Sequence, residues 1–492
     1  MDHSDAGSLE SRPRRAILRS GAPDRRFMAM NAPSLYTPPR PEIPAGDLGW
    51  YQLLVTLRTN ALRMWPARAY EDDILVQSFF GRQRMLLNHP DAIRHVLVEN
   101  AGNYRRSPAT IRILRPIVGD GLFLSEGEAW KHQRRTIAPA LAPRVIPILV
   151  RHVADAADEA VTRLAAMNGA PVDLLSLMQF LALEIAGRSM FSLEMQQHGA
   201  ALRRFIASFA SRLGRPHLLD MVLPASIVNP RDLARRRFRS RWLAFMDELI
   251  ALRLESPGSE TPRDLFDMLL AARDPETGAA FSRAQLRDQV ATMIVAGHET
   301  TAIALFWSLF LLASAPAEQE RLAAEAETAE LSPDGAADSL PQLTFTRAVV
   351  SEALRLYPPA FIIVREAIEP DRWNGMDIPP RRLVMIAPWV LHRHRKFWDN
   401  PDAFDPRRFL RDTTAAHRFA YLPFGAGPRV CVGAQFAMAE AVLVLAALVR
   451  SFRVELADGD SVLPVAVVTT QPDHPARFRL RPRTSAALMS KF

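Results

Sequence analysis

The chain has 492 residues, of which 48% are hydrophobic, and carries a formal net charge of +8. This length and apolar content allow a large buried core, and neither internal repeats nor a flexible linker between domains is visible. The single cysteine excludes an intrachain disulfide, which fits a reducing compartment and leaves the thiol free to bind a metal.

The positive charge raises nucleic-acid or membrane-surface binding as a class of function, because residues 235–241 are rich in arginine. Acidic residues are spread through the chain, however, and no base-stacking module is visible. We therefore expect this run to be the solvated face of a helix and expect no nucleic-acid partner.

Residues 1–45 are rich in proline, serine and arginine and hold no apolar run long enough for a signal sequence or an anchor. We expect a disordered tail there, followed by a single domain at 46–492. The arginines suggest a mitochondrial transit peptide, but the acidic residues among them argue against one. A later start at Met28 or Met30 stays open, as does a shallow membrane-surface contact by the amphipathic segment 50–65.

Strands are predicted at 74–80 and 82–88, as a hairpin about Gly81. Residues 452–456 begin another strand, followed by a turn at 458–459. Nearly everything between these regions has helical periodicity. The sequence thus predicts a mainly α fold with small antiparallel β-sheets on one side.

Trp130 and Arg134 lie four residues apart and share one face of a predicted helix. Such pairs also occur on ordinary amphipathic helices. The pair therefore becomes informative only together with other motifs.

The longest predicted element is a helix from residue 284 to about 314, opened by a capping box between Ser282 and Gln285. At about 1.5 Å per residue it would be roughly 45 Å long. Such a helix could cross a whole domain.

Gly297 and the polar residues 298–301 interrupt the apolar sequence of this helix, which is costly unless water or a ligand meets them. A membrane span over 290–313 is the alternative. His298 and Glu299 would then lie near the bilayer centre, so a buried helix is favoured and no transmembrane anchor is expected.

Glu352 and Arg355 lie three residues apart on a helical run, and Pro406-Arg407-Arg408-Phe409 follows later. Taken alone, such a Glu–Arg pair is an ordinary surface salt bridge worth about a few tenths of a kcal/mol. The pair becomes informative only together with the later segment 406–409 and the other motifs of the chain.

Cys431 lies within residues 424–433, FGAGPRVCVG, and a helical run over 434–450 follows it. The N-terminus of that helix and nearby backbone N–H groups can offset the charge of a thiolate. Glycines at 425 and 427 let the backbone turn tightly against a flat group. A lone cysteine is more often a small buried hydrophobe, but the spacing of the residues around it argues for a metal-binding loop.

These motifs, in this order, resemble the cytochrome P-450 superfamily over residues 120–435, as a soluble, bacterial-type member. The haem-binding pattern Phe-x-x-Gly-x-Arg-x-Cys-x-Gly falls on residues 424–433. The resemblance implies the cytochrome P-450 fold and haem b, iron protoporphyrin IX, with Cys431 as the thiolate ligand that favours O–O cleavage. The other haem-binding residues that it implies are Trp130, Arg134, Ala296, Gly297, Arg365, Phe424, Gly425, Arg429 and Gly433.

The resemblance also assigns the polar cluster of the long helix to catalysis. It implies that Glu299 relays protons from solvent and that Thr300 hydrogen-bonds the bound dioxygen. An acid and an alcohol at this place favour the use of dioxygen.

For Glu352, Arg355 and Arg408 the resemblance implies a buried charge network that holds the cysteine loop. Arg407 stands where the family more often has glutamate, and His394 where aspartate is frequent. Neither difference affects a residue that binds iron.

The implied activity is a monooxygenase, which inserts one atom of dioxygen into an apolar substrate by hydroxylation or epoxidation. The segment after Cys431 is too short for a reductase domain, so electrons are expected from a separate ferredoxin-type donor with an NAD(P)H-dependent reductase. Basic residues such as Arg134, Arg135 and Arg429 could steer that partner. The alternative is a peroxide-using or non-oxygenating haem-thiolate protein.

The substrate class stays open in the sequence. Pocket residues are expected at Met293, Phe361, Ile363, Val364 and Thr469. Most are apolar, so a fatty acid, terpene, steroid or aromatic compound is compatible, and Arg112 or Arg115 either holds a carboxylate or faces water. A cytoplasmic location is expected.

Overall fold

The computed structural model describes residues 35–79, 82–192, 198–223, 227–255, 261–411, 418–457 and 461–483. The chain divides into two units, Met1–Leu35 and Tyr36–Phe492, and the description below concerns the second. Residues 1–34 of the tail predicted at 1–45, with the possible start residues, lie outside the described residues. So do Gly81 and the turn predicted at 458–459.

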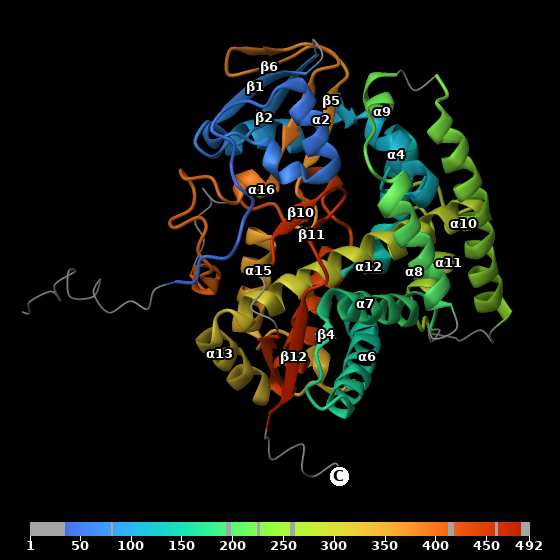
Figure 1. The fold of residues 1–492 in the computed structure, drawn as a ribbon. Coiled ribbons are helices and arrows are strands. Elements are labelled where there is room, and N and C mark those ends of the chain that lie inside the picture. Colours follow the sequence, from blue (N-terminus) through green and yellow to red (C-terminus); the bar gives the residue numbers. More distant parts are fainter. Residues whose placement is uncertain are drawn as a thin grey trace, which may run out of the picture. The chain divides into compact units, whose positions relative to one another are not determined.

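The described chain is mainly helical, with small sheets, as predicted (Figure 1). Its α-helices are α2 (Trp50–Thr59), α3 (Pro90–Arg94), α4 (Pro108–Val118), α5 (Gly127–Ile137), α6 (Ile146–Ala166), α7 (Leu174–Phe191), α8 (Gly199–Ser208), α9 (Leu218–Val222), α10 (Pro230–Glu255), α11 (Leu265–Ala271), α12 (Arg283–Ala313), α13 (Pro316–Glu327), α14 (Ala336–Ser339), α15 (Thr344–Leu356), α16 (Pro388–Leu391) and α17 (Ala434–Ser451). The helices predicted over 284–314 and 434–450 are α12 and α17.

The strands form one five-stranded sheet and three smaller ones. They are β1 (Ile74–Phe79), β2 (Arg82–Leu87), β3 (Tyr104–Arg106), β4 (Val172–Asp173), β5 (Ile363–Ala367), β6 (Asp371–Trp373), β7 (Met376–Ile378), β8 (Leu383–Ile386), β9 (Phe452–Leu456), β10 (Pro464–Ala466), β11 (Thr470–Pro472) and β12 (Arg477–Pro482). The largest has the order β1-β2-β8-β5-β3, and the others are β4-β12-β9, β10-β11 and β6-β7.

The pairings differ in two respects from those predicted. The β1–β2 hairpin is antiparallel as expected, but β2 and β8 run parallel, because β8 reaches the sheet only after a long connection through the helices. The strand at 452–456 is β9, and its partner is the distant β12 rather than the segment that follows directly. Pairing between distant segments is set by tertiary packing.

Residues 36–44 are attached to the rest of their unit, although the sequence placed them in the tail. Phe404 N–H donates to Tyr36 O at 2.8 Å, and the Tyr357 hydroxyl donates to Pro39 O at the same distance. Because these backbone carbonyls are bound, the structured part of the chain begins before residue 46.

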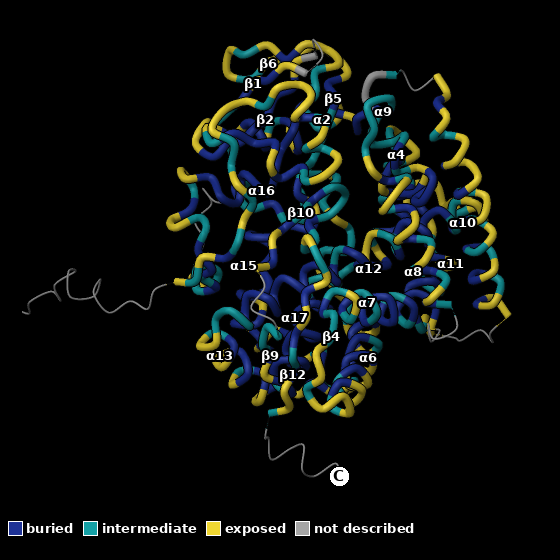
Figure 2. The backbone as a smooth tube through the Cα atoms, in the orientation of Figure 1, coloured by how far each residue is buried: buried dark blue, intermediate teal, exposed yellow. Residues whose placement is uncertain are grey.

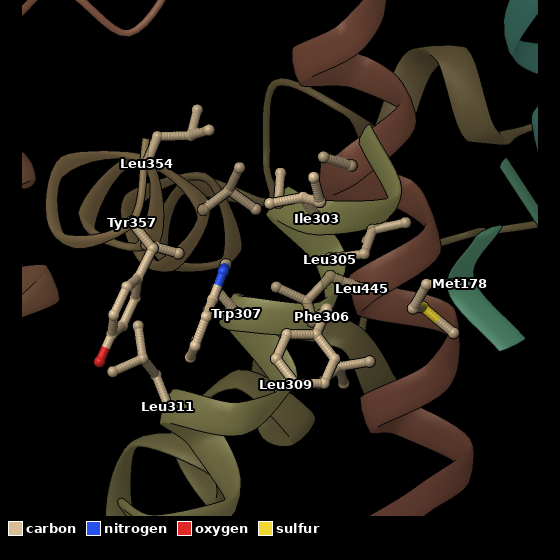
Figure 3. Packing of buried hydrophobic residues seen from close by; sticks show 14 of the residues in the cluster. Met178, Ile303, Leu305, Phe306, Trp307, Leu309, Leu311, Leu354, Tyr357 and Leu445 are labelled. Carbon is tan, nitrogen blue, oxygen red and sulfur yellow. The ribbon is translucent and has the colours of Figure 1, made fainter. Parts of the chain in front are cut away.

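Helix α12 crosses the middle of the view in Figure 1. It begins with the predicted capping box, in which the Ser282 side chain accepts from Gln285 N–H and the Gln285 side chain from Ser282 N–H. Residues 302–312 are all buried. Figure 3 shows this part packed between neighbouring helices, and the Trp307 ring stacks on that of Tyr357 with centroids 3.9 Å apart.

Three helices, α7, α12 and α17, have the length and composition of membrane spans. In α12, 78% of the most apolar window is buried inside the protein, and 67% in each of the other two. The dark core of Figure 2 includes them. Their apolar side chains are thus covered mostly by the rest of the chain.

The arginine run at 235–241 lies in α10 and is not wholly solvated. Arg235 is 2% exposed and donates to both carboxylate oxygens of Asp220, at 2.6 and 2.9 Å. Phe238 and Trp242 are buried as well. The helical period explains this, because residues three and four apart share the inner face while their neighbours point outward.

Candidate active site

The cysteine loop ends at the start of α17 and is shaped by glycine. Cys431 N–H donates to Phe424 O at 2.9 Å, which closes the loop. Gly425 and Gly427 both have a φ of +73°, and a Cβ at Gly427 would lie 1.8 Å from the carbonyl oxygen of Leu97. Only glycine fits position 427 without displacing that backbone.

The Cys431 side chain is open to an internal cavity of about 1530 Å³. Burial raises the pKa of its thiol, while the Gly433 N–H and the Arg134 charge oppose that rise. Arg134, on α5, donates to Val430 O at 2.9 Å, beside the cysteine. The cation and the backbone donor thus offset part of the effect of burial, which still keeps the pKa above its ordinary value.

Three arginines gather around one carboxylate at the same cavity. The antiparallel register of β3 and β5 places Arg106 opposite Arg365, and Arg429 lies close enough to affect both. Glu126 accepts from Arg106 and Arg429. Burial, followed by the like charges, lowers the pKa of Arg106 to about 9 and that of Arg365 to about 10.

This cluster holds more positive charge than Glu126 can neutralise. Arg429 also lies over the Trp130 ring, 4.5 Å from its centroid. Within the described residues, the Arg365 side chain donates to its neighbour's carbonyl, Val364 O, at 3.0 Å. Guanidinium groups in this geometry suit a ligand with carboxylate groups.

Helix α12 turns Glu299, Thr300 and Thr301 toward the cavity, whereas His298 points to Gln179 O on α7. Ala296 and Gly297 are exposed there, and a Cβ added at Gly297 would meet nothing within 4 Å. The Thr300 hydroxyl, which also lines the cavity, donates to Ala296 O at 2.7 Å. This stretch of helix leaves room for a bulky group.

The carboxylate of Glu299 is held from outside its own helix. The side chains of Thr469 and Gln471 donate to Oε1 at 2.7 and 2.6 Å. Next to it, His298 is 2% exposed, and burial lowers its pKa to about 4, so its ring is neutral. Of these two adjacent residues of α12, Glu299 therefore carries the acid group and His298 a neutral ring.

The predicted pocket residues Met293, Phe361, Ile363, Val364 and Thr469 all line the cavity, as do Phe424, Gly425 and Gly433. Arg112 does not point a free charge at it. Its guanidinium donates to Asp232, at 2.6 Å from Nη2, and these bonds lower the pKa of Asp232 to about 2. Arg115 pairs with Asp120 at 2.8 Å.

The sequence matches the profile of the family described as Cytochrome P450 over residues 50–475. The chain belongs to the cytochrome P450 family. Cyclooctatin synthase of Streptomyces melanosporofaciens is 33% identical over 76% of this P450 and 82% of the relative. Pentalenene oxygenase of Streptomyces avermitilis is 31% identical over 80% and 86%.

Solved structures agree with this fold. The crystal structure of the cytochrome P450DA heme domain superposes with a TM-score of 0.76 and 24% identity, covering 91% of this chain and 98% of that one. With its family and its monooxygenase relatives, the chain is a P450 monooxygenase, an oxidoreductase that uses dioxygen, an organic substrate and redox partners. The family implies a haem-thiolate cofactor.

The residues of this P450 fit such a cofactor. Cys431 offers a thiol to the cavity, Gly297 leaves space on α12, and among the described residues Glu126 is one carboxylate against three arginines. Haem needs all three: a ligand for its iron, space for its flat ring and positive charge for its two carboxylates.

The predicted charge network of the P450 is present. Glu352 and Arg355 are both fully buried and joined by two hydrogen bonds of 2.7 and 2.8 Å. Arg408 donates to Glu352 at 3.1 Å. Arg355 also donates to the carbonyls of His392, Pro401 and Ala403, so the network fixes the chain segment that leads to the cysteine loop.

The link from this network to the loop passes through a residue that the sequence did not single out. His392 Nε2 accepts from Leu422 N–H at 2.8 Å, two residues before the loop begins. Burial lowers the pKa of His392 to about 3, which keeps that nitrogen free to accept. The Tyr421 hydroxyl donates to Ser351 O at 2.9 Å on α15.

Arg106 and Glu126 were missed as well. Arg106 comes to the site through strand pairing, and Glu126 through its bonds to two arginines. The sequence held no usable signal for Arg106, because a strand of three residues is too short to show a periodic pattern.

Proposed function

We propose that Cys431 is the thiolate ligand of haem b and that this P450 inserts one atom of dioxygen into an apolar substrate. The observation that carries the proposal is the accessible Cys431 thiol in a cavity that also holds the unbalanced arginines. When bound, the haem would supply the electron density that favours O–O cleavage. Arg106, Arg365 and Arg429 would bind its carboxylates.

Glu299 and Thr300 are proposed to bring protons to the cavity. The Glu299 carboxyl would give up a proton and regain one from solvent, and the Thr300 hydroxyl would carry it onward once it rotates away from Ala296 O. Because this acid and alcohol line the cavity, dioxygen is favoured over peroxide as the oxidant.

The substrate is proposed to be a terpene-type hydrocarbon. Two observations support this class: the walls at Met293, Phe361, Ile363 and Val364 are apolar, and relatives are named for cyclooctatin and pentalenene. Since Arg112 is bound to Asp232, it is not available to hold a fatty-acid carboxylate.

The electron donor is proposed to be a ferredoxin with an NAD(P)H-dependent reductase, acting in the cytoplasm. Arg134 and Arg429 have no docking role in this proposal, because they bond to Val430 O and Glu126 inside the protein. Lys131, exposed on α5, is the better candidate to meet an acidic partner, because its ion pair with Glu128, at 2.7 Å, lies at the surface.

The first test is the carbon monoxide difference spectrum of the dithionite-reduced protein. A Soret band far to the red is expected for a thiolate-ligated haem, and Cys431→His should move it to the ordinary haem–CO position. A wild-type band at that ordinary position contradicts the thiolate assignment.

The second test uses pentalenene as the probe. It should shift the spin state of the iron on titration and yield an oxygenated product with a ferredoxin, a reductase and NADH. If Thr300→Ala keeps NADH consumption fully coupled to product, the proton assignment is wrong.

A further inference from the structure

The β10–β11 hairpin is the element that holds the acid. Thr469 Oγ1 and Gln471 Nε2 both donate to Oε1 of Glu299, and the Gln471 amide is also 3.3 Å from Thr469 Oγ1. Neither donor meets Oε2, so the second oxygen of the carboxylate is left to other partners. Glu299 is 8% exposed, and hydrogen bonds to a buried carboxylate are strong and directional.

The position of these residues in the hairpin places both side chains on the same atom. Thr469 ends the bend between β10 and β11, and Gln471 follows two residues later within β11. Both side chains reach Glu299, while that of Thr470, between them, turns to the other side. The Thr470 hydroxyl donates to Pro358 O at 2.7 Å on that other side. One short segment is thus fixed to the body of the protein and presents two donors to α12.

The hairpin is also tied to α12 a second time. The Trp307 indole N–H donates to Thr470 O at 2.8 Å, and both residues are fully buried. Trp307 lies on the same helix as Glu299, about 12 Å further along at about 1.5 Å per residue. Two anchor points on one helix set the orientation of the hairpin against it (Figure 1).

The same hairpin lines the cavity through Val467, Val468 and Thr469. It therefore touches both the space for the substrate and the acid that serves it.

We propose that Thr469 and Gln471 are positioning residues, which hold the Glu299 carboxylate in the orientation from which it delivers protons. The inference rests on the proposed role of Glu299. It changes the interpretation of Thr469, which the sequence placed among substrate-contacting residues. The hydroxyl of Thr469 is turned to the acid, and its contribution should pass through Glu299 rather than through substrate affinity.

The test compares Thr469→Val, which removes the hydroxyl at nearly constant shape, with Thr469→Ser, which keeps it. Turnover with pentalenene is followed as product and hydrogen peroxide formed per NADH. Thr469→Val should form product about tenfold more slowly and release more peroxide, a part of the about 10²–10⁴-fold that a positioned acid contributes. Thr469→Ser should stay near wild type, and pentalenene affinity should change little in both.

The matched control is Thr162→Val, whose hydroxyl on α6 donates to Asp158 O at 3.0 Å on an exposed surface. It should couple NADH to product like the wild type. Coupling in Thr469→Val equal to that of this control overturns the inference.

A double-mutant cycle decides whether Thr469 acts through the acid. In a Glu299→Gln background, Thr469→Val should have little further effect on coupling, and additive losses contradict the proposal. Gln471→Leu should behave in the same way as Thr469→Val.

An infrared measurement needs no turnover. The carboxylate band of Glu299 is the one that Glu299→Gln removes. It should shift in Thr469→Val, because a hydrogen bond to Oε1 is lost. An unshifted band contradicts the proposed positioning role of Thr469. The carbon monoxide difference spectrum distinguishes failure of the proposed function from failure of this inference. If the wild type lacks the thiolate band, the proposed function is wrong. If the band is present but the coupling losses of the two mutations add, only the positioning role is wrong.

Discussion

The two halves of α12 have different surroundings. Residues 302–312 are all buried, and their apolar side chains interlock with neighbouring helices (Figure 3). In residues 296–301, by contrast, Gly297 faces open space and the buried His298 Nδ1 and Thr301 Oγ1 have no hydrogen-bond partner within the described chain. We infer that the packed half supplies stability and that the cavity half, left incompletely satisfied, is shaped for its ligand.

The packed half can be tested with Leu305→Ala. Leu305 is fully buried, so the change should lower the free energy of unfolding by about 3–5 kcal/mol through lost burial and an internal cavity. Leu233→Ala is the matched control, since Leu233 on α10 is 53% exposed and should cost little. Chemical denaturation of the two variants and the wild type measures the difference. Equal losses would mean that this half of α12 is not a special source of stability.

The cavity half should respond in activity instead. Glu299→Gln keeps an oxygen that accepts from Thr469 but removes the acid, so product formation should fall by about 10²-fold or more while stability hardly changes. Product per NADH and the thermal midpoint are the two readouts. Glu248→Gln, at an exposed glutamate on α10, is the control and should change neither. A strongly lowered thermal midpoint in Glu299→Gln would contradict the contrast between the halves.

The sequence was informative about α12 because its signals are local. The capping box at 282–285 and the helix-forming and apolar residues on both sides of 297–301 predicted the helix to within a residue at each end. The pairing of Glu352 with Arg355 was likewise readable, since three residues along a helix bring side chains together. The loop around Cys431 carried its own pattern of glycines.

What the sequence did not reveal depends on long-range pairing. Arg106 reaches the arginine cluster only because β3 pairs with β5 in a register that sets it opposite Arg365. His392 joins the charge network to the cysteine loop through a turn that brings it to Leu422 N–H. Thr469 meets Glu299 because the bend between β10 and β11 is held against α12, 170 residues away in the sequence. Local periodicity holds no information about any of these contacts.

Acid should destabilise the cavity half through His298. Burial lowers its folded pKa to about 4 from an ordinary value of 6.5, so between these values the unfolded chain binds a proton that the folded chain does not. Its contribution to stability is therefore complete above about pH 6.5 and is lost as the pH falls toward 4. The loss should be about 3 kcal/mol, since the unfolded and folded pKa values differ by about 2.5 and one pKa unit is about 1.4 kcal/mol. Denaturation of wild type and His298→Asn at several pH values measures it, and the two curves should run parallel above pH 7 and separate below it.

The smallest expected effect is a gain of stability rather than a loss, and it tests the difference between the two halves of α12 directly. Thr301 is 3% exposed and its hydroxyl has no partner within the described chain, although it lies in the same helix as the well-packed Leu305. Replacing that hydroxyl by a methyl group in Thr301→Val removes an unsatisfied polar atom at constant shape, so the protein should gain about 1 kcal/mol of stability. Ser308→Ala, in the packed half, is the counterpart: its hydroxyl donates to Ala304 O at 2.7 Å and should cost stability when lost. Denaturation midpoints that move in opposite directions would show that polar groups are hydrogen-bonded in the packed half and left without partners in the cavity half. A loss of stability in Thr301→Val would instead mean that this hydroxyl is bound, by water or by the cofactor, and that the cavity half is completed by what fills it.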